Sequence, residues 1–160
     1  MNYQTTASST EETKKTKKVK TINEFNQNPT SAYIGASWGV LIIGLLSYCI
    51  GLWNANMELN EKGYYFTILL MGLYAAISLQ KAVRDKAEGI KVSEMYYGIS
   101  WVIVIAAILL ISIGLRNADL ELSEKGFYAI SFVLSLFGAI TVQKNTRDIE
   151  FIKNKTEKEE

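Results

Sequence analysis

Hydrophobic residues along the 160-residue chain gather in four long runs that are separated by polar stretches. Residues 33–53 and 96–115 contain no Asp, Glu, Lys or Arg, and neither do the shorter runs at residues 63–79 and 126–142. At about 1.5 Å of rise per residue, the longer runs reach about 30 Å as helices, the thickness of a bilayer's hydrocarbon core. The shorter runs need flanking residues or local thinning of the bilayer to complete a crossing. The pattern predicts an all-α membrane protein with four transmembrane helices.

A soluble four-helix bundle is the alternative to this interpretation. Helices of that kind carry charged residues on the face turned to solvent, at a period of about 3.6 residues. None of the four runs has such a charged face. In lipid, a helix also satisfies every backbone N–H and C=O group internally. We therefore interpret all four runs as membrane spans.

The polar stretch GLWNANMELNEKG at residues 51–63 returns as GLRNADLELSEKG at residues 114–126, with nine of thirteen positions identical. The same offset of 63 residues relates QKAVRD at residues 80–85 to QKNTRD at residues 143–148. The chain is therefore a tandem repeat of one helical hairpin. Because each copy crosses the membrane twice, both copies start on the same side. A pseudo-twofold axis along the membrane normal should relate these tandem, parallel hairpins.

The repeat divides the chain into two transmembrane units with a polar tail at either end. Residues 33–90 form the first two-helix repeat and residues 91–150 form the second. Residues 1–32 are rich in Thr, Ser, Lys, Asn and Gln, which predicts a disordered basic tail. They lack the apolar segment of a cleavable signal peptide, so the first span should remain in the mature protein. Residues 151–160 form a second, charged tail.

Basic residues are concentrated on one side of the predicted spans. The N-terminal tail, residues 80–95 and the segment after residue 142 together carry 14 Lys and Arg, whereas the two short hairpin loops carry three. Short loops rich in Lys and Arg stay in the cytoplasm. The charges therefore predict that both termini and the middle connection are cytoplasmic.

The repeated hairpin loops have residues that begin a helix. In each repeat, an N-cap residue is followed by an acidic residue that favours the positive end of the helix dipole. An apolar pair flanks them with the spacing of a hydrophobic staple. The N-cap, acidic residue and staple pair are Asn60, Glu61, Leu59 and Tyr64 in the first repeat, and Ser123, Glu124, Leu122 and Phe127 in the second.

A metal site is the alternative interpretation of these loops, because the pseudo-symmetry would bring five carboxylates to one face of the membrane. Hard cations favour such oxygen ligands. The five residues are Glu58, Glu61, Asp119, Glu121 and Glu124. Each loop also holds a lysine, and neither has the spacing of a calcium-binding loop. We therefore predict no metal site.

The repeated QKxxRD motif lies where the second and fourth spans emerge on the cytoplasmic side. Its lysine and aspartate are four residues apart, so Lys81 with Asp85, and Lys144 with Asp148, can pair on one helix face. The favoured interpretation is an interfacial anchor whose long side chains reach the headgroups. The alternative is a cytoplasmic anion or partner site. Its residues would be Arg84 and Arg147.

Small residues recur four positions apart within the spans, a spacing that lets helices approach closely in lipid. They are Gly35 and Gly39, Ser47 and Gly51, Gly72 and Ala76, and Ser131, Ser135 and Ala139.

Residue types that carry most catalysis are missing from the sequence. The chain has no histidine, and its one cysteine, Cys49, lies inside a span. Histidine is the usual acid–base group near neutral pH, and no acidic residue lies in any span. We expect no catalytic residue, no cofactor and no enzymatic activity. The tail lysines are not interleaved with aromatic residues, so we expect no nucleic-acid partner.

Two functions follow from these observations. The first is a non-enzymatic structural, assembly or stress-related membrane component, with the lipid bilayer, further copies of the chain or other membrane proteins as partners. The second is a subunit of a small oligomeric transporter or channel. Ion-coupled carriers typically use a buried ionisable residue, and the spans contain none. A pore would have to be lined by hydroxyl groups, namely those of Ser47, Ser78, Ser112, Ser131 and Thr141.

The segments GLWNANMELNEKGYYF, QKAVRDK, LSEKGFY and LSLFGAITVQKNTRD resemble the YiaA/YiaB family of bacterial inner-membrane proteins. The resemblance runs from about Ser31 to Asp148. It implies a multi-pass protein of the bacterial inner membrane built from a two-helix domain, and it implies no catalytic residue. The basic N-terminal tail lies outside the resemblance, and Arg116 stands where the first repeat has Trp53.

Overall fold

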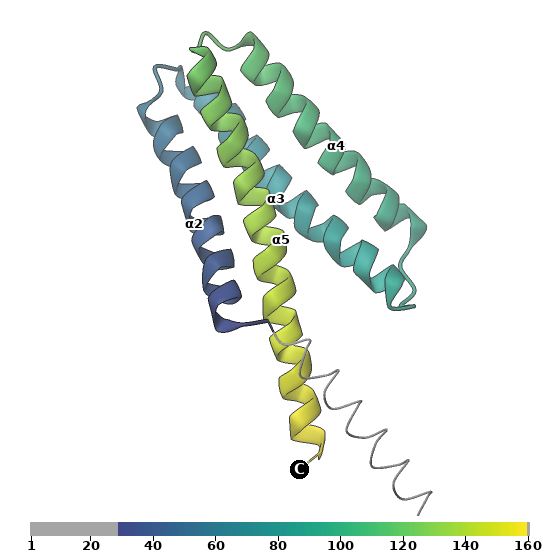
Figure 1. The fold of residues 1–160 in the computed structure, drawn as a ribbon. Coiled ribbons are helices and arrows are strands. Elements are labelled where there is room, and N and C mark those ends of the chain that lie inside the picture. Colours follow the sequence, from purple (N-terminus) through teal and green to yellow (C-terminus); the bar gives the residue numbers. More distant parts are fainter. Residues whose placement is uncertain (1–28, 160) are drawn as a thin grey trace, which may run out of the picture.

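The computed structural model describes residues 29–159, which form four α-helices joined by short connections (Figure 1). The helices are α2 (Ser31–Asn54), α3 (Leu59–Ala87), α4 (Glu94–Asn117) and α5 (Leu122–Glu159). Each contains a segment long and apolar enough to cross a membrane. Residues 29–159 contain no β-strand. The prediction of an all-α membrane protein with four transmembrane helices is confirmed.

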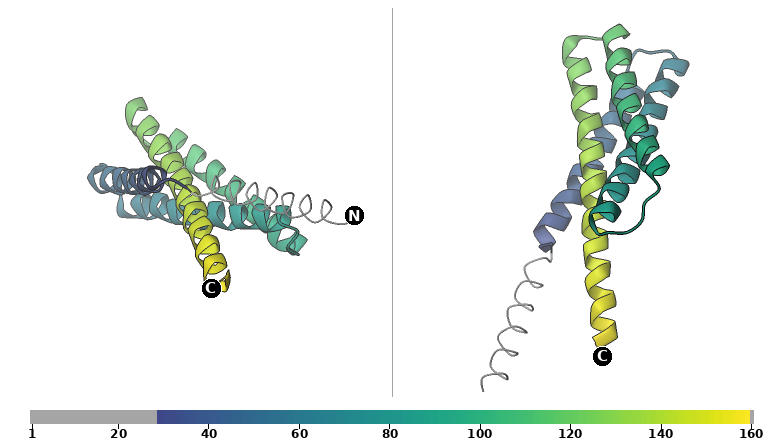
Figure 2. Two further views of the ribbon diagram at one scale, coloured as in Figure 1. Left: turned by 60° about the horizontal axis from the view of Figure 1, so that its bottom comes forward. Right: turned by 90° about the vertical axis from the view of Figure 1, so that its right-hand side faces the viewer.

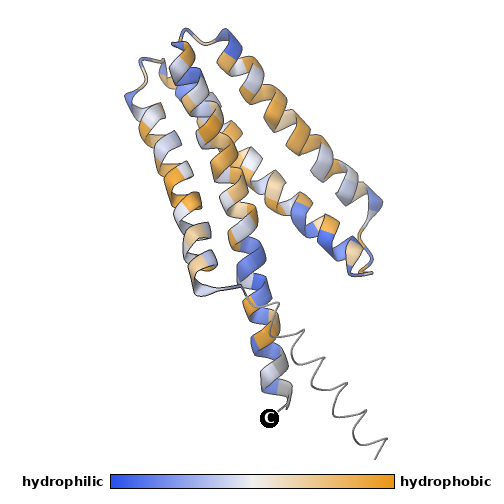
Figure 3. Ribbon diagram, viewed as in Figure 1, coloured by the Kyte–Doolittle hydropathy of each residue, from blue (hydrophilic) through white to orange (hydrophobic). Residues whose placement is uncertain are grey.

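The bundle has two chemically different ends. We call the end with the loops at residues 55–58 and 118–121 the hairpin end. The opposite end, with the connection at residues 88–93 and the QKxxRD motifs, is the basic end. Figure 3 shows hydrophobic residues along the middle of the helices and hydrophilic residues toward both ends.

Two helices extend well beyond the charge-free runs at the basic end. α3 continues to Ala87, and α5 remains helical through the predicted tail as far as Glu159. This part of α5 projects beyond the other helices (Figures 1 and 2). α2 begins at Ser31, next to Thr30, whose Oγ1 accepts a hydrogen bond from the Tyr33 amide at 3.3 Å. Most of the tail for which the sequence predicts disorder, residues 1–28, lies outside the described residues.

The two repeats interlock. α2 packs mainly on α5, and α3 packs mainly on α4, whereas the two helices within each repeat touch only slightly. α3 also crosses α5 (Figure 2). The offset of 63 residues exchanges α2 with α4 and α3 with α5, so it turns one main helix pair into the other. This pairing agrees with the predicted pseudo-twofold relation, and it means that each repeat completes the packing of the other.

The backbones of α2 and α5 come very close together at two glycines. A Cβ atom on Gly138 would lie 2.6 Å from Leu41 Cα, and one on Gly44 would lie 2.7 Å from a backbone nitrogen of α5. Only glycine permits such an approach without a shift of one helix. By contrast, a Cβ atom on Gly35 or Gly39 would meet nothing within 4 Å. The spacing of small residues at Gly35 and Gly39 therefore does not mark a close contact with another described helix of this chain.

Aromatic side chains join three helices near the hairpin end. Tyr48 of α2 is fully buried, and its hydroxyl donates a hydrogen bond to the Tyr65 carbonyl oxygen of α3 at 3.0 Å. Its ring meets the ring of Tyr128 of α5 edge to face, with centroids 5.6 Å apart. Phe132 and Leu69 extend this buried cluster. These contacts hold the α2–α5 pair against α3.

The predicted N-caps and staples at the hairpin end are wrong. α3 begins at Leu59 with Glu58 as its N-cap, so Asn60 lies inside the helix. α5 begins at Leu122, so Ser123 is likewise already helical. Leu59 and Leu122 project outward, 86% and 84% exposed. Glutamate replaces the expected cap chemistry because its longer side chain can reach back to the first free backbone amides.

Candidate functional site

At the basic end, long side chains bring the two QKxxRD motifs into contact, although α3 and α5 pack together nearer the hairpin end. α3 stops just after its motif, since Gly89 has a φ of 76° that other residues rarely adopt. The Gly89 amide donates to the Lys86 carbonyl at 3.2 Å, and the Ile90 amide donates to the Asp85 carbonyl at 2.9 Å. These two bonds form a Schellman motif that ends the helix. In the second repeat, Ile152 stands in place of the glycine, and α5 continues.

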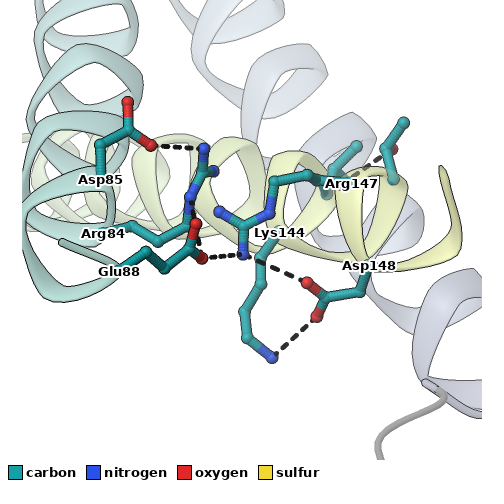
Figure 4. Close-up of polar contacts among 8 residues, drawn as sticks. Arg84, Asp85, Glu88, Lys144, Arg147 and Asp148 are labelled. Carbon is teal, nitrogen blue, oxygen red and sulfur yellow. Dashed lines mark hydrogen bonds and ion pairs between the residues drawn. The ribbon is translucent and has the colours of Figure 1, made fainter. Parts of the chain in front are cut away.

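Arg84 and Arg147, the two arginines of the motifs, share one carboxylate. Arg84 Nε lies 3.5 Å from Glu88 Oε1, and Arg147 Nη2 lies 3.9 Å from the same oxygen. Glu88 therefore links α3 to α5 and stands between the two guanidinium groups, as Figure 4 shows. Each arginine also contacts the aspartate that follows it, Asp85 at 2.7 Å and Asp148 at 3.2 Å.

One of the two predicted lysine–aspartate pairs is present. Lys144 Nζ lies 3.4 Å from Asp148 Oδ2, as the spacing of four residues predicts. Asp85 instead pairs with Arg84. Among the ion pairs of residues 29–159, none joins Lys81 to Asp85. Only one lysine therefore takes part in the motif's ion pairs, and both arginines do.

Several polar atoms at the basic end are shielded from solvent without a hydrogen bond to the described residues. In each repeat these are a glutamine oxygen and an arginine nitrogen one helical turn further on. The atoms are Gln80 Oε1 and Arg84 Nε on α3, and Gln143 Oε1 and Arg147 Nη1 on α5. Asn145 Oδ1 on α5 is a fifth atom of this kind, without a counterpart in the first repeat. Leaving a buried polar group unpaired costs about 1–3 kcal/mol, so this part of the molecule is under-satisfied in hydrogen bonds.

A buried asparagine ties α5 to α2 at the same end. Asn145 is 2% exposed, and its Nδ2 donates to Ser37 Oγ at 2.9 Å. The serine hydroxyl in turn donates to the Tyr33 carbonyl at 2.7 Å. Asn145 occupies one of the variable positions of the motif, where the first repeat has Ala82. That departure from the repeat is the signal in the sequence that marks this contact.

The carboxylates at the hairpin end support the helix starts and do not come together. Glu61 Oε2 accepts from the Glu58 amide at 3.0 Å, and Glu124 Oε2 accepts from the Glu121 amide at 2.9 Å. Within the described part of the chain, no three Asp, Glu, Cys or His side chains form a group suited to a metal ion. The predicted alternative of a carboxylate cluster is therefore not supported by their positions.

Two of the five hydroxyl groups considered for a pore donate to the backbone of their own helices. Ser112 Oγ donates to the Ile108 carbonyl at 2.7 Å, and Thr141 Oγ1 donates to the Phe137 carbonyl at 2.8 Å. Ser131 is buried and Ser112 is exposed, so these residues do not share one surface. Two adjoining grooves, of 340 and 260 Å³, lie between α3 and α4 near the hairpin end. Tyr64 lines both grooves, and its hydroxyl donates to the Leu110 carbonyl at 2.9 Å.

Four apolar helices with polar caps, arranged as two interlocked two-helix repeats, define a multi-pass membrane protein. The family model described as the yiaA/B two helix domain matches the chain twice, at residues 33–85 and 96–148. The chain therefore belongs to the YiaA/YiaB two-helix family, and the resemblance in the sequence is confirmed.

Named relatives agree with this assignment. The chain is 54% identical to inner membrane protein YiaA of Escherichia coli over 117 residues, which are 73% of this chain and 81% of that protein. It is 28% identical to inner membrane protein YiaB of the same bacterium over 102 residues, 62% of this chain and 84% of that protein. The membrane protein YubF of Bacillus subtilis is 38% identical over 66 residues, 41% of this chain and 76% of that protein. No solved structure matches the chain.

Proposed function

We propose that this inner-membrane protein is a non-enzymatic component with a structural, assembly or stress-related role, and that both of its termini lie in the cytoplasm. The proposal rests mainly on how the polar groups of the spans are used. Ser37, Tyr48 and Asn145 join one helix to another, and several other span hydroxyls bond to their own backbone. Polar groups committed to packing in this way suit a stable membrane scaffold better than a reaction or transport site.

The outward faces of the helices suit contacts with lipid or with other membrane proteins. Ile105 and Leu109 of α4 lie one turn apart and are each about half exposed, while Ile111 on the same helix is buried. A photo-crosslinking amino acid at residue 105 should yield protein adducts in native membranes, and one at residue 111 should yield none. Adducts of twice the chain's mass would identify a homo-oligomer. A residue-105 variant that yields only lipid adducts would argue against a role through protein partners.

A transporter or channel subunit is the second candidate, favoured by the grooves between α3 and α4. The full chain reconstituted in liposomes should release trapped ions and small solutes no faster than protein-free liposomes. Solute flux that depends on the protein, and that Thr67→Val in the larger groove abolishes, would establish transport and overturn the scaffold proposal. Thr146→Val, at an exposed position of α5 away from both grooves, is the matched control.

The orientation can be tested separately by labelling in intact cells. The natural thiol is first removed by Cys49→Ser, and a new cysteine then replaces Asp119 at the hairpin end or Lys91 at the basic end. A membrane-impermeant maleimide that reaches the periplasm should label the Asp119→Cys protein and spare the Lys91→Cys protein. The opposite result would reverse the orientation, against the distribution of basic residues.

A further inference from the structure

Glu88 lies between two arginine side chains but makes only long contacts with both. Its Oε1 atom lies 3.5 Å from Arg84 Nε and 3.9 Å from Arg147 Nη2. Charge-assisted hydrogen bonds between guanidinium and carboxylate groups are about 2.7–2.9 Å long. The carboxylate therefore balances the charge of both guanidinium groups without forming a short hydrogen bond to either.

The two arginines retain donors that no described residue satisfies. Arg84 Nε and Arg147 Nη1 are both shielded from solvent and make no hydrogen bond. The side chains are 20% and 30% exposed, so they are largely packed into the protein and held in place by Asp85 and Asp148. A guanidinium group presents its N–H donors in a planar fork that matches phosphate as well as carboxylate. Two such forks from different helices suit an anion with more acceptor oxygens than Glu88 offers.

The neighbouring glutamines add further hydrogen-bonding capacity. Gln80 lies one turn before Arg84 on α3, and Gln143 lies one turn before Arg147 on α5, so each pair shares a helix face. The side-chain oxygens of both glutamines are buried and unpaired. They can accept hydrogen bonds from a hydroxyl or ammonium group carried next to a phosphate.

The depth of this cluster corresponds to the headgroup layer of a membrane. The apolar run of α3 ends at Leu79, and that of α5 ends at Val142. Arg84 and Arg147 each follow five residues later, about 7 Å further along a helix. Phosphate groups of lipids lie at this level, just outside the hydrocarbon core.

From these observations we propose that Arg84 and Arg147 form a binding site for a phosphate group, which Glu88 closes in the absence of the ligand. Glu88 directly follows the last residue of α3, and its side chain is 52% exposed. The side chain is therefore free to turn outward. The phosphate is that of a lipid headgroup or a free phosphate ion, two sources with the same recognition chemistry. The site goes beyond the proposed scaffold role and does not depend on it.

The test uses the full chain purified in a maltoside detergent, which contains no phosphate. Its unfolding temperature is followed while short-chain phosphatidylglycerol, short-chain diacylglycerol or inorganic phosphate is added at constant ionic strength. If phosphatidylglycerol stabilises the protein and diacylglycerol does not, the ligand is the phosphate of a lipid headgroup. Stabilisation by inorganic phosphate assigns it to the free ion. The proposal is overturned if none of the three additives has an effect.

Variants separate a built site from general attraction between charges. The double variant Arg84→Gln, Arg147→Gln should bind the phosphate ligand at least about tenfold more weakly, because two charge-assisted contacts are lost. The control Lys91→Gln, Lys153→Gln removes the same charge from exposed positions of the basic end and should bind like the natural chain. Equal weakening in the two double variants would overturn the proposal.

Glu88→Gln keeps both arginines, and it serves as the decisive variant if the arginine variant fails to fold. Removing the competing carboxylate should tighten binding by about threefold or more, since the ligand then displaces no charged group. Weaker binding by Glu88→Gln would show that Glu88 belongs to the ligand's own contacts, and the proposed closure would be wrong.

Discussion

Gly138 of α5 rests directly on the backbone of Leu41 of α2, where a Cβ atom would come within 2.6 Å of Leu41 Cα. The contact joins helices from different repeats, which share most of the packing surface of the bundle. Because backbone atoms stand on both sides, neither helix can yield by turning a side chain. We regard this approach as the point where the interlocking of the repeats is most sensitive to change.

Gly138→Ala should therefore destabilise the protein even though alanine is the better helix former. The added methyl group forces the helices apart, and overpacking of this kind typically costs about 1–3 kcal/mol. Gly35→Ala is the matched control, because nothing lies within 4 Å of its new Cβ atom. The free energy of unfolding in detergent, measured by circular dichroism, should fall for residue 138 and stay level or rise for residue 35. Equal values for both variants would show that α2 and α5 are not in close contact.

Interlocking also predicts how the chain behaves when it is cut. Separate fragments ending at residue 90 and beginning at residue 91 should be unstable alone and should purify together when produced in one cell. Each repeat alone leaves its helices almost without a partner, because most of their contacts are with the other repeat. Affinity purification through a tag on one fragment measures the association. Two fragments that fold independently, each with full helical content, would contradict the interlocked arrangement.

The membrane protein YubF matches the chain over a length close to that of one repeat. The matched segment of 66 residues is about as long as the repeat offset of 63 residues, and it makes up 76% of that protein. Two copies of a single hairpin can form the same four-helix arrangement through symmetric exchange of partners. In this chain, the connection at residues 88–93 keeps the two units in one molecule.

The sequence alone predicts the number of helices and their repeat, because absence of charge over a bilayer's thickness is a strong signal. It does not predict which helices touch, because lipid-facing and helix-facing positions are equally apolar. Gly35 and Gly39 look as suitable for close packing as Gly44 and Gly138, yet only the latter pair contacts another helix. Gly72, which the spacing of small residues also selects, does pack against an aromatic ring of α5.

The sequence predicts only some residues of the candidate site, because it does not show which side chains of different helices meet. Arg84 and Arg147 stand out because the repeat contains both, and they do meet. Glu88 does not stand out, because Phe151 occupies the equivalent position in the second repeat. In the fold, the Arg147 side chain reaches from α5 to Glu88, so this acidic residue becomes the partner of both arginines. Asn145 does stand out as a departure from the repeat, but its partner Ser37 is identified only by the packing of α5 on α2.

The Tyr48 hydroxyl provides a test of the buried aromatic cluster. Tyr48→Phe should lower the free energy of unfolding by about 1 kcal/mol, because the Tyr65 carbonyl loses its hydrogen-bond donor while the ring packing is kept. Tyr74→Phe on α3 is the control, since its side chain is 66% exposed. Thermal unfolding in detergent measures both. A loss as large for residue 74 as for residue 48 would mean that the buried hydrogen bond has no particular importance.

The contact between Asn145 and Ser37 should show energetic coupling in a double-mutant cycle. The Asn145 amide donates to the serine hydroxyl at 2.9 Å in a buried position, and side-chain hydrogen bonds between transmembrane helices average about 0.6 kcal/mol. We expect Asn145→Ala and Ser37→Ala to couple by about this amount, as measured by the free energy of unfolding in detergent. Ser100→Ala is the control, because this repeat equivalent of Ser37 donates to Tyr96 of its own helix. It should show no coupling to Asn145→Ala.

A coupling near zero for residue 37 would mean that the two side chains do not act together, and the polar link between α2 and α5 would have to be abandoned. Coupling of equal size for Ser100 would point to a general loosening of the bundle, because that serine bonds within α4. Asn145→Ala also recreates the residue of the first repeat, Ala82, in the second. A stable Asn145→Ala protein would therefore show that the hydrogen bond to Ser37 is not required for α2 and α5 to pack together. The α2–α5 packing would then rest on the close glycine contacts, and the asparagine would supply only the additional polar link.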